Sequence, residues 1–157
     1  MTVESLESIR KQIIVEVPRK QAFEVFTGQM GAWWNSAYHI GGEPFAEIVI
    51  EPHEGGAWYE VDESGTRCDW GRVLVWDPPR RLLLNWQISA HWMHDPELVT
   101  ELDLSFTPLS DSTTLVELEH RRLENLGEAA AGIRVQLDDP SGWQGLLDRF
   151  ALRCALR

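Results

Sequence analysis

The acidic side chains that could do chemistry in this sequence lie among aromatic residues. Glu60 follows Trp58 and Tyr59, and Asp69 precedes Trp70. A carboxyl group held among aromatic rings can have a raised pKa, and it can then serve as an acid in a cyclase or a dehydratase. The alternative is that each carboxylate faces solvent from its strand.

His120 is the second candidate for acid–base chemistry. It has the inward parity of its predicted strand, where a buried imidazole needs a hydrogen-bond partner, and Thr100 or Thr114 could supply one. The pattern favours a core histidine with satisfied ring nitrogens over a general base.

One stretch carries histidines at a spacing that metal sites use. His91 and His94 lie three residues apart with Asp95 adjacent, but no third ligand is evident and Pro96 gives the stretch the character of a turn. We therefore predict no metal site and no cofactor. Trp92 in the same stretch could be exposed, as a contact site or as part of a lid.

The short motifs of common active sites do not occur. The sequence has no Gly-x-Ser-x-Gly elbow, no glycine-rich phosphate loop and no His-Glu-x-x-His motif. The predicted strands that can be oriented carry no inward pair of carboxylates. We therefore assign no catalytic residue.

Composition excludes several classes of partner. The 25 acidic residues exceed the 14 basic ones, for a formal net charge of −11, whereas nucleic acids and anionic membranes require clustered Lys and Arg. No segment approaches the roughly 18 apolar residues of a membrane-spanning helix. Cys68 and Cys154 are far apart and no apolar signal segment precedes them, so we expect free thiols and a cytoplasmic location.

Hydrophobic periodicity predicts the elements that must position these residues. Residues 9–17 alternate as a strand, Pro18 begins a short helix that ends near Gly28, and a second helical piece carries Met30, Trp33 and Trp34. Adjacent helical residues point about 100° apart, so at most one of this tryptophan pair should face fully inward. Turn signals separate six further strands, at 45–51, 56–61, 68–77, 81–89, 98–107 and 113–121.

The last element is predicted to be a long amphipathic helix. A connector at 124–139 precedes it, and Ser141 with Gln144 has the spacing of a capping box. Apolar residues then recur at helical spacing: Trp143, Leu146, Leu147, Phe150 and Cys154. We predict an α+β fold of one domain, residues 9–157 after a tail at 1–8. A curved antiparallel sheet of about seven strands would wrap around the C-terminal helix, with two short helices after the first strand.

Several motifs together resemble a known family. They are Met30-Gly31-Ala32-Trp33-Trp34, Gly55-Gly56-Ala57-Trp58, the segment from Gly71 to Leu82 with Asp77-Pro78-Pro79-Arg80-Arg81, and Gly142-Trp143. In combination, over residues 9–157, they resemble the activator of heat-shock-protein-90 ATPase homologue C-terminal-domain-like family of the START, or SRPBCC, helix-grip superfamily. The resemblance implies a hydrophobic cavity between the sheet and the C-terminal helix, open at one end to a small apolar or amphipathic molecule.

Eight tryptophans in 157 residues predict a broad aromatic interior, which is either packed core or the wall of that cavity. We expect Trp86 and Trp143 to meet there. The predicted ligand-binding residues are Trp33, Trp34, Trp58, Trp70, Trp86, Leu102, Leu104, Phe106, Leu118, His120, Trp143, Leu147 and Phe150.

The first functional hypothesis is non-catalytic binding of a small hydrophobic or aromatic ligand, oriented by His120, Glu60 or Tyr59. An alternative is a cyclase, dehydratase or hydrolase that uses Glu60, Asp69 or His120 in the same cavity. A further alternative is a chaperone-linked protein-interaction module. A second copy of the chain or a chaperone would then be the partner. The shared fold does not select among these three uses.

Overall fold

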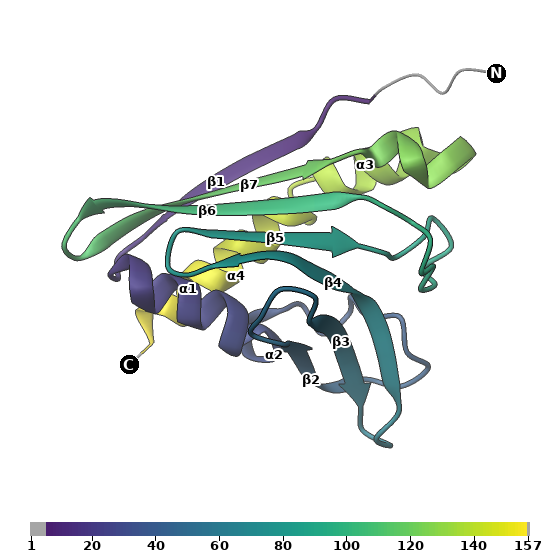
Figure 1. Ribbon diagram of the computed structural model, residues 1–157, viewed down its shortest axis with the longest axis horizontal. Coiled ribbons are helices and arrows are strands. Elements are labelled where there is room, and N and C mark those ends of the chain that lie inside the picture. The colour runs from purple at the N-terminus through teal and green to yellow at the C-terminus, as the bar shows by residue number, and fades with distance from the viewer. Residues whose placement is uncertain (1–5, 157) are drawn as a thin grey trace.

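A single sheet of seven antiparallel strands curves around the C-terminal helix (Figure 1). The computed structural model describes residues 6–156. In chain order the elements are β1 Ile9–Val15, α1 Arg19–Gly28, α2 Met30–Trp33, β2 Phe45–Ile50, β3 Ala57–Asp62, β4 Arg67–Asp77, β5 Arg81–Trp86, β6 Glu101–Ser110, β7 Thr113–Arg121, the 3₁₀ helix η1 Leu123–Ala129, α3 Ala130–Asp138 and α4 Trp143–Ala155. The strand order β1-β7-β6-β5-β4-β3-β2 makes β1 and β7 the one neighbouring pair that is not consecutive in the chain. The predicted α+β helix-grip architecture is confirmed.

Strands β6 and β7 each have one buried face and one exposed face. Leu102, Leu104 and Phe106 are buried, and the register places Leu104 opposite Leu118 of β7. The residues between them face outward, where Arg121 binds Asp103 at 3.0 Å. The inner faces of these strands therefore form the floor beneath α4.

Strand β4 did not show a clear alternation in the sequence, and two bulges explain this. Its pairing with β3 jumps past Trp70, and its pairing with β5 jumps past Leu74. An unpaired residue of this kind reverses the side-chain parity that follows it. Trp70 and Val73 are thus both buried although their positions have opposite parity.

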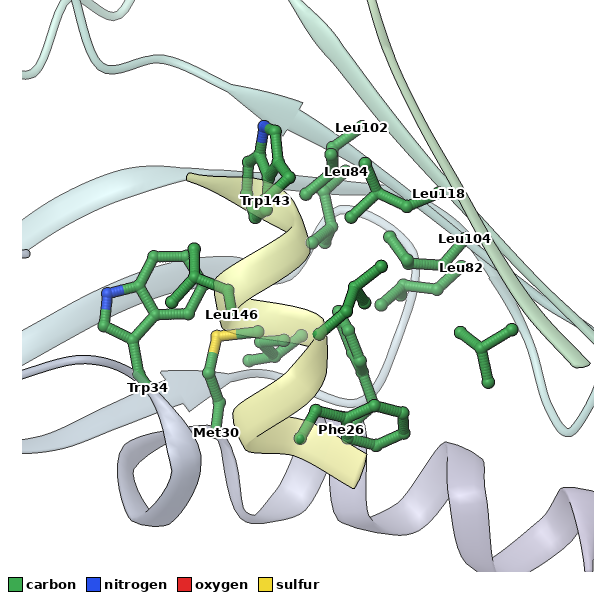
Figure 2. Packing of buried hydrophobic residues seen from close by; sticks show 14 of the residues in the cluster. Phe26, Met30, Trp34, Leu82, Leu84, Leu102, Leu104, Leu118, Trp143 and Leu146 are labelled. Atoms are coloured by element: carbon green, nitrogen blue, oxygen red, sulfur yellow. The ribbon is translucent and has the colours of Figure 1, made fainter. Parts of the chain in front are cut away.

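The helices cover the concave face of the sheet. α4 crosses this face (Figure 1), α1 contacts β2, β6 and β7, and α2 contacts β2. Figure 2 shows Trp34 and Leu146 near the end of α4 where Trp143 lies, whereas Phe26 lies farther along the helix. There Phe26 meets Phe150 with ring centroids 5.3 Å apart. The core is therefore continuous from α1 to the beginning of α4.

Three predicted boundaries are corrected by pairing partners. β1 ends at Val15, which pairs with Thr114, and beyond this pair the Thr114 hydroxyl donates to the Val17 carbonyl at 2.9 Å. β5 ends at Trp86, and Ile88 forms only an isolated bridge to His94. β6 begins at Glu101 rather than at 98.

The predicted capping box at the start of α4 is wrong. The Ser141 hydroxyl donates to Asp139 Oδ1 at 2.7 Å, and the Gln144 amide donates to Asp148 Oδ1 at 3.2 Å. The N-cap is Gly142, which caps without a side chain. A Cβ at Gly142 would overlap the carbonyl oxygen of Leu137, so close approach of the two backbones requires glycine at this corner.

The pair Trp33 and Trp34 also departs from the prediction, because both side chains are buried. α2 ends at Trp33, and Trp34 has extended backbone angles of φ −62° and ψ 146°. The helical angle between neighbouring side chains therefore does not apply to this pair.

No helix within residues 6–156 combines the length and apolar character that crossing a membrane would require.

Candidate functional site

Five tryptophans from five different parts of the chain form one aromatic cluster. It consists of Trp34 after α2, Trp58 of β3, Trp70 of β4, Trp86 of β5 and Trp143 of α4. Successive ring centroids lie 5.2 to 5.8 Å apart, from the Trp34–Trp70 pair to the Trp34–Trp143 pair. These are the spacings of favourable aromatic contacts. The predicted meeting of Trp86 and Trp143 is confirmed, with centroids 5.4 Å apart.

Gly71 allows β4 and β5 to come close enough for this cluster. It pairs with Trp86, and a Cβ at this position would overlap the carbonyl oxygen of Asn85 and touch the ring of Trp58. Trp58 itself is fully buried. The sequence therefore combines a glycine with the largest side chains in order to stack rings across three strands.

A cavity of about 200 Å³ opens beside this cluster. Its wall comes from the segment after α2, from the β5–β6 loop and from the corner between α3 and α4. The lining residues are Trp34, Tyr38, Trp86, Trp92, Gln136, Leu137, Ser141, Gly142, Trp143 and Leu146. The wall is mostly apolar, as small-molecule sites are.

A narrow extension of about 20 Å³ adjoins it. It shares Trp34, Tyr38, Trp86 and Trp92 with the main cavity and adds His39, Ile40, Trp70 and Ile88. The two hollows therefore share part of their wall, and His39 lines the smaller one.

Trp92 forms the outer wall of the cavity. Its side chain is 43% exposed, and its φ of 58° is unusual for a residue other than glycine. The tight turn is closed by the Ser89 amide donating to the Met93 carbonyl at 2.8 Å. The expectation that Trp92 could be exposed is confirmed.

A larger hollow of about 540 Å³ follows β1, β7 and β6 but has a different character. Its wall carries charged groups that bind one another, such as Arg81 with Asp103 at 2.9 Å and Arg10 with Glu119 at 3.3 Å. Arg81 and Arg121 lower the pKa of Asp103 below its ordinary range, although burial opposes them. This surface is a network of paired charges rather than an apolar site.

His120 is buried and both of its ring nitrogens are used. The indole N–H of Trp143 donates to His120 Nδ1 at 3.1 Å. Because that nitrogen accepts, Nε2 carries the hydrogen and donates to Thr100 Oγ1 at 3.1 Å, and the Thr100 hydroxyl donates to the Trp86 carbonyl at 2.7 Å. Burial lowers the pKa of His120 to about 3. The interpretation of His120 as a satisfied core histidine with Thr100 as partner is confirmed.

Glu60 is fully buried, and the alternative that it faces solvent is therefore wrong. Its Oε1 accepts from Trp70 Nε1 at 2.8 Å, from the Ile40 amide at 2.7 Å and from the Gly41 amide at 3.4 Å. Its Oε2 has no partner within the described residues and lies 3.9 Å from His39 Nδ1.

Tyr59 and Asp69 lie away from the cavity. Arg67 binds Asp69 at 2.7 Å, and its guanidinium carbon lies 3.8 Å from the centroid of the Tyr59 ring. These two residues therefore belong to a surface cluster on β3 and β4 and not to the cavity. His94, for its part, has Nε2 3.3 Å from Gln87 Oε1, a contact within the β5–β6 loop.

The structure divides the predicted ligand-binding residues into two sets. Four line the cavity or its extension: Trp34, Trp70, Trp86 and Trp143. The others are buried in the core and do not line it: Trp33, Trp58, Leu102, Leu104, Phe106, Leu118, His120, Leu147 and Phe150.

Sequence reasoning missed Tyr38, His39 and Leu137 as lining residues. Tyr38 and His39 lie between α2 and β2, in a segment with no periodicity to assign an inward face. One signal was present: aromatic residues in this segment, with Tyr38 four positions after Trp34, whose indole N–H donates to the Tyr38 carbonyl at 2.8 Å.

Comparison with known proteins supports the fold. A structure of the anthrahydroquino-gamma-pyrone synthase Txn09 complexed with SUM is 37% identical, with a TM-score of 0.68 over 95% of this chain and 97% of that one. The self-sacrificing resistance protein CalC from Micromonospora echinospora is 27% identical, with a TM-score of 0.69 over 94% of each chain. A protein from Rhodobacter sphaeroides, 19% identical over 95% of this chain and 93% of that one with a TM-score of 0.67, shares the fold.

No curated protein matches the sequence significantly. The model of the family described as Activator of Hsp90 ATPase homolog 1-like protein matches residues 16–153, which run from the end of β1 to the last turn of α4. Because this match covers most of the chain and the Txn09 and CalC structures agree with it, the chain belongs to that family, within the SRPBCC helix-grip superfamily.

Proposed function

We propose that this protein binds a planar aromatic molecule in the cavity between Trp92 and the N-terminal end of α4. The observation that carries the proposal is the cavity wall itself, in which Trp34, Tyr38, Trp86, Trp92 and Trp143 converge from four separate segments. Each aromatic pair that a flat ligand forms with such a wall contributes about 0.5–1.5 kcal/mol beyond its buried area.

The size of the cavity limits how the ligand enters. A volume of about 150 Å³ holds one benzene molecule, and this cavity has about 200 Å³. One ring with its substituents therefore fits inside, and a molecule of several fused rings would enter by one edge. Its remaining rings would lie at the rim against Trp92, which is partly exposed.

The few polar groups of the wall would orient such a ligand. The Tyr38 hydroxyl donates to the Ser141 carbonyl at 2.9 Å and keeps its lone pairs for a further donor. Gln136 adds an amide at the same wall. These groups suit a ligand with hydroxyl or carbonyl substituents at its edge.

A second candidate function is ring-forming catalysis on a molecule of this kind. It is favoured by the 37% identity, over 95% of this chain, to a synthase whose name describes an anthrahydroquinone fused to a pyrone. Fold alone would not select this activity. A substrate with fused aromatic rings is consistent with the tryptophan-lined wall.

The test is a titration of the intrinsic tryptophan fluorescence with anthraquinone, hydroxylated anthraquinones, a fatty acid and a sterol. We expect the planar aromatic compounds to quench the emission and to raise the melting temperature. Trp92→Ala should weaken their binding about 5- to 10-fold, since losing one aromatic contact costs about 1 kcal/mol. Trp76→Phe is the matched control, because Trp76 lies near Phe23 at another part of the core. If no planar compound quenches the emission or raises the melting temperature, the proposal is wrong.

A further inference from the structure

Two buried polar atoms lie close together beside the extension of the cavity, without a hydrogen-bond partner within the described residues. They are Glu60 Oε2 and His39 Nδ1, 3.9 Å apart. Buried polar atoms without a partner are uncommon and call for an explanation. A separation of 3.9 Å exceeds a hydrogen bond by about 1 Å, so a small movement of the imidazole would join them.

The carboxylate is held rigidly on its other side. Three N–H groups, from Trp70, Ile40 and Gly41, donate to Oε1. The backbone at Gly41 passes so close that a Cβ there would lie 3.1 Å from Oε2. Glu60 therefore presents Oε2 in a fixed direction, and the histidine is the group that can adjust.

The imidazole connects this carboxylate to the cavity. His39 lines the extension together with Trp34, Trp70 and Trp86. Its side chain is 23% exposed while its Nδ1 is buried. The exposed fraction of the side chain therefore belongs to its other atoms.

We propose that His39 and Glu60 form a proton-accepting pair for a phenolic or enolic hydroxyl of the bound aromatic molecule. This inference rests on the proposed function, because it assigns the chemistry of the ligand in that same cavity. Glu60 acts on the ligand only through His39 and is a positioning residue.

The proton transfer balances without any further reactant. The ligand O–H bond breaks, its oxygen keeps the electron pair as a phenolate or enolate, and the proton forms a bond to His39 Nε2. The imidazolium then donates Nδ1–H to Glu60 Oε2, which stabilises its positive charge. A carboxylate behind an imidazole fixes the tautomer in this manner. An enolate formed in this way is the nucleophile that ring closure onto a carbonyl would use.

The other titratable groups near this pair do not compete for the proton. Cys68 of β4 lies close to Gly41, and burial together with the Glu60 charge raises the pKa of its thiol. Asp62, two residues after Glu60, accepts from Ser64 and Thr66, and these hydrogen bonds lower its pKa. Tyr38 already donates its hydroxyl proton to Ser141. His120 has both nitrogens occupied.

The experiment uses alizarin, a dihydroxyanthraquinone whose visible absorption moves to longer wavelength when a hydroxyl ionises. When the pH is about one below the pKa of the free dye, about a tenth of it is ionised, and a pKa lowered by about one on binding raises this fraction to about half. We expect the wild-type complex to show this roughly fivefold increase. His39→Gln should bind the dye, measured by tryptophan quenching, but leave the ionised fraction near that of the free dye.

Two more variants separate the roles. Glu60→Gln keeps an oxygen for the three N–H donors but turns an amide toward His39 Nδ1, so we expect an ionised fraction well below wild type. His53→Gln removes an exposed histidine on the β2–β3 connection and should behave as wild type. Circular dichroism confirms the fold of each variant.

The outcomes distinguish the two proposals. Quenching without an increase in ionised dye overturns the proton-accepting pair and leaves the binding cavity standing. An increase that survives in His39→Gln also overturns the pair, because another group must then accept the proton. If alizarin and the other planar compounds fail to quench the emission, both proposals are overturned.

Discussion

Lowering the pH should destabilise this protein through a single buried histidine. His120 has an ordinary pKa of 6.5 and a folded-state pKa of about 3, because burial disfavours the charged imidazolium. Between these two pKa values the unfolded chain binds a proton at this imidazole and the folded chain does not. The stability that neutral His120 contributes is fully present above its unfolded-state pKa and is lost as the pH falls from about 6.5 toward 3.

The magnitude follows from the two pKa values. A difference of one between the folded-state and unfolded-state pKa corresponds to about 1.36 kcal/mol. Between about pH 7.5 and pH 5 the unfolded state gains nearly all of its proton while the folded state gains almost none, and the free energy of unfolding falls by about 2 kcal/mol. For a domain of this size that loss lowers the melting temperature by about 4–8 °C.

The assay is urea denaturation followed by tryptophan fluorescence at both pH values. His120→Gln cannot take the proton and should lose most of the pH dependence, although it will be less stable at the higher pH because Trp143 and Thr100 lose a partner. Carboxylates with lowered pKa values, such as Asp103, contribute only at more acidic pH. His53→Gln is the control for an exposed histidine. An equal loss of stability in wild type and His120→Gln would refute the reasoning.

Two further predictions concern packing. Gly71→Ala should lower the free energy of unfolding by more than about 3 kcal/mol or prevent folding, because the new methyl group would overlap the Asn85 backbone. Gly132→Ala in α3, with open space around it, should raise the free energy of unfolding by up to about 1 kcal/mol. Thermal melts compare the two variants directly, and equal effects would contradict the close approach of the backbone at Gly71. Thr100→Val should lower the free energy of unfolding by about 1–3 kcal/mol, because it leaves His120 Nε2–H without an acceptor. Thr113→Val is the control and should change this free energy little, because the Thr113 hydroxyl contacts the exposed Ser110. A Thr100→Val variant as stable as wild type would contradict the assigned tautomer.

The parts of the fold that could be predicted from the sequence are those where one face of an element is wet and the other dry. β6 and β7 satisfy this condition, and their inward residues were assigned correctly. β4 does not, because bulges at Trp70 and Leu74 reverse its parity twice. Bulges depend on the partner strands and leave no periodic signal in their own strand.

The candidate site was less predictable because its parts are remote in sequence. Glu60 was recognised as a carboxylate among aromatic residues, but its burial depends on a loop about twenty residues earlier, which supplies the Ile40 and Gly41 amides. His39 could not be predicted as a site residue, because its segment has no hydrophobic periodicity that would assign it an inward face. Only the fold brings its Nδ1 within 3.9 Å of Glu60.

The filled interior explains why the usable space lies at one end of the helix grip. Trp58, Trp70 and Trp86 pack against one another with centroids 5.4 to 6.4 Å apart, and the leucines of β6 and β7 close the floor beneath α4. A ligand cannot enter this region without displacing rings that pack at the density of a solid. The cavity near Trp92 has one outer wall on a loop, and this wall can move at much lower cost. In the proposed binding mode, selectivity should therefore depend on the polar edge of the ligand that meets Tyr38, Gln136 and His39, while the rest of the molecule contacts the tryptophan wall.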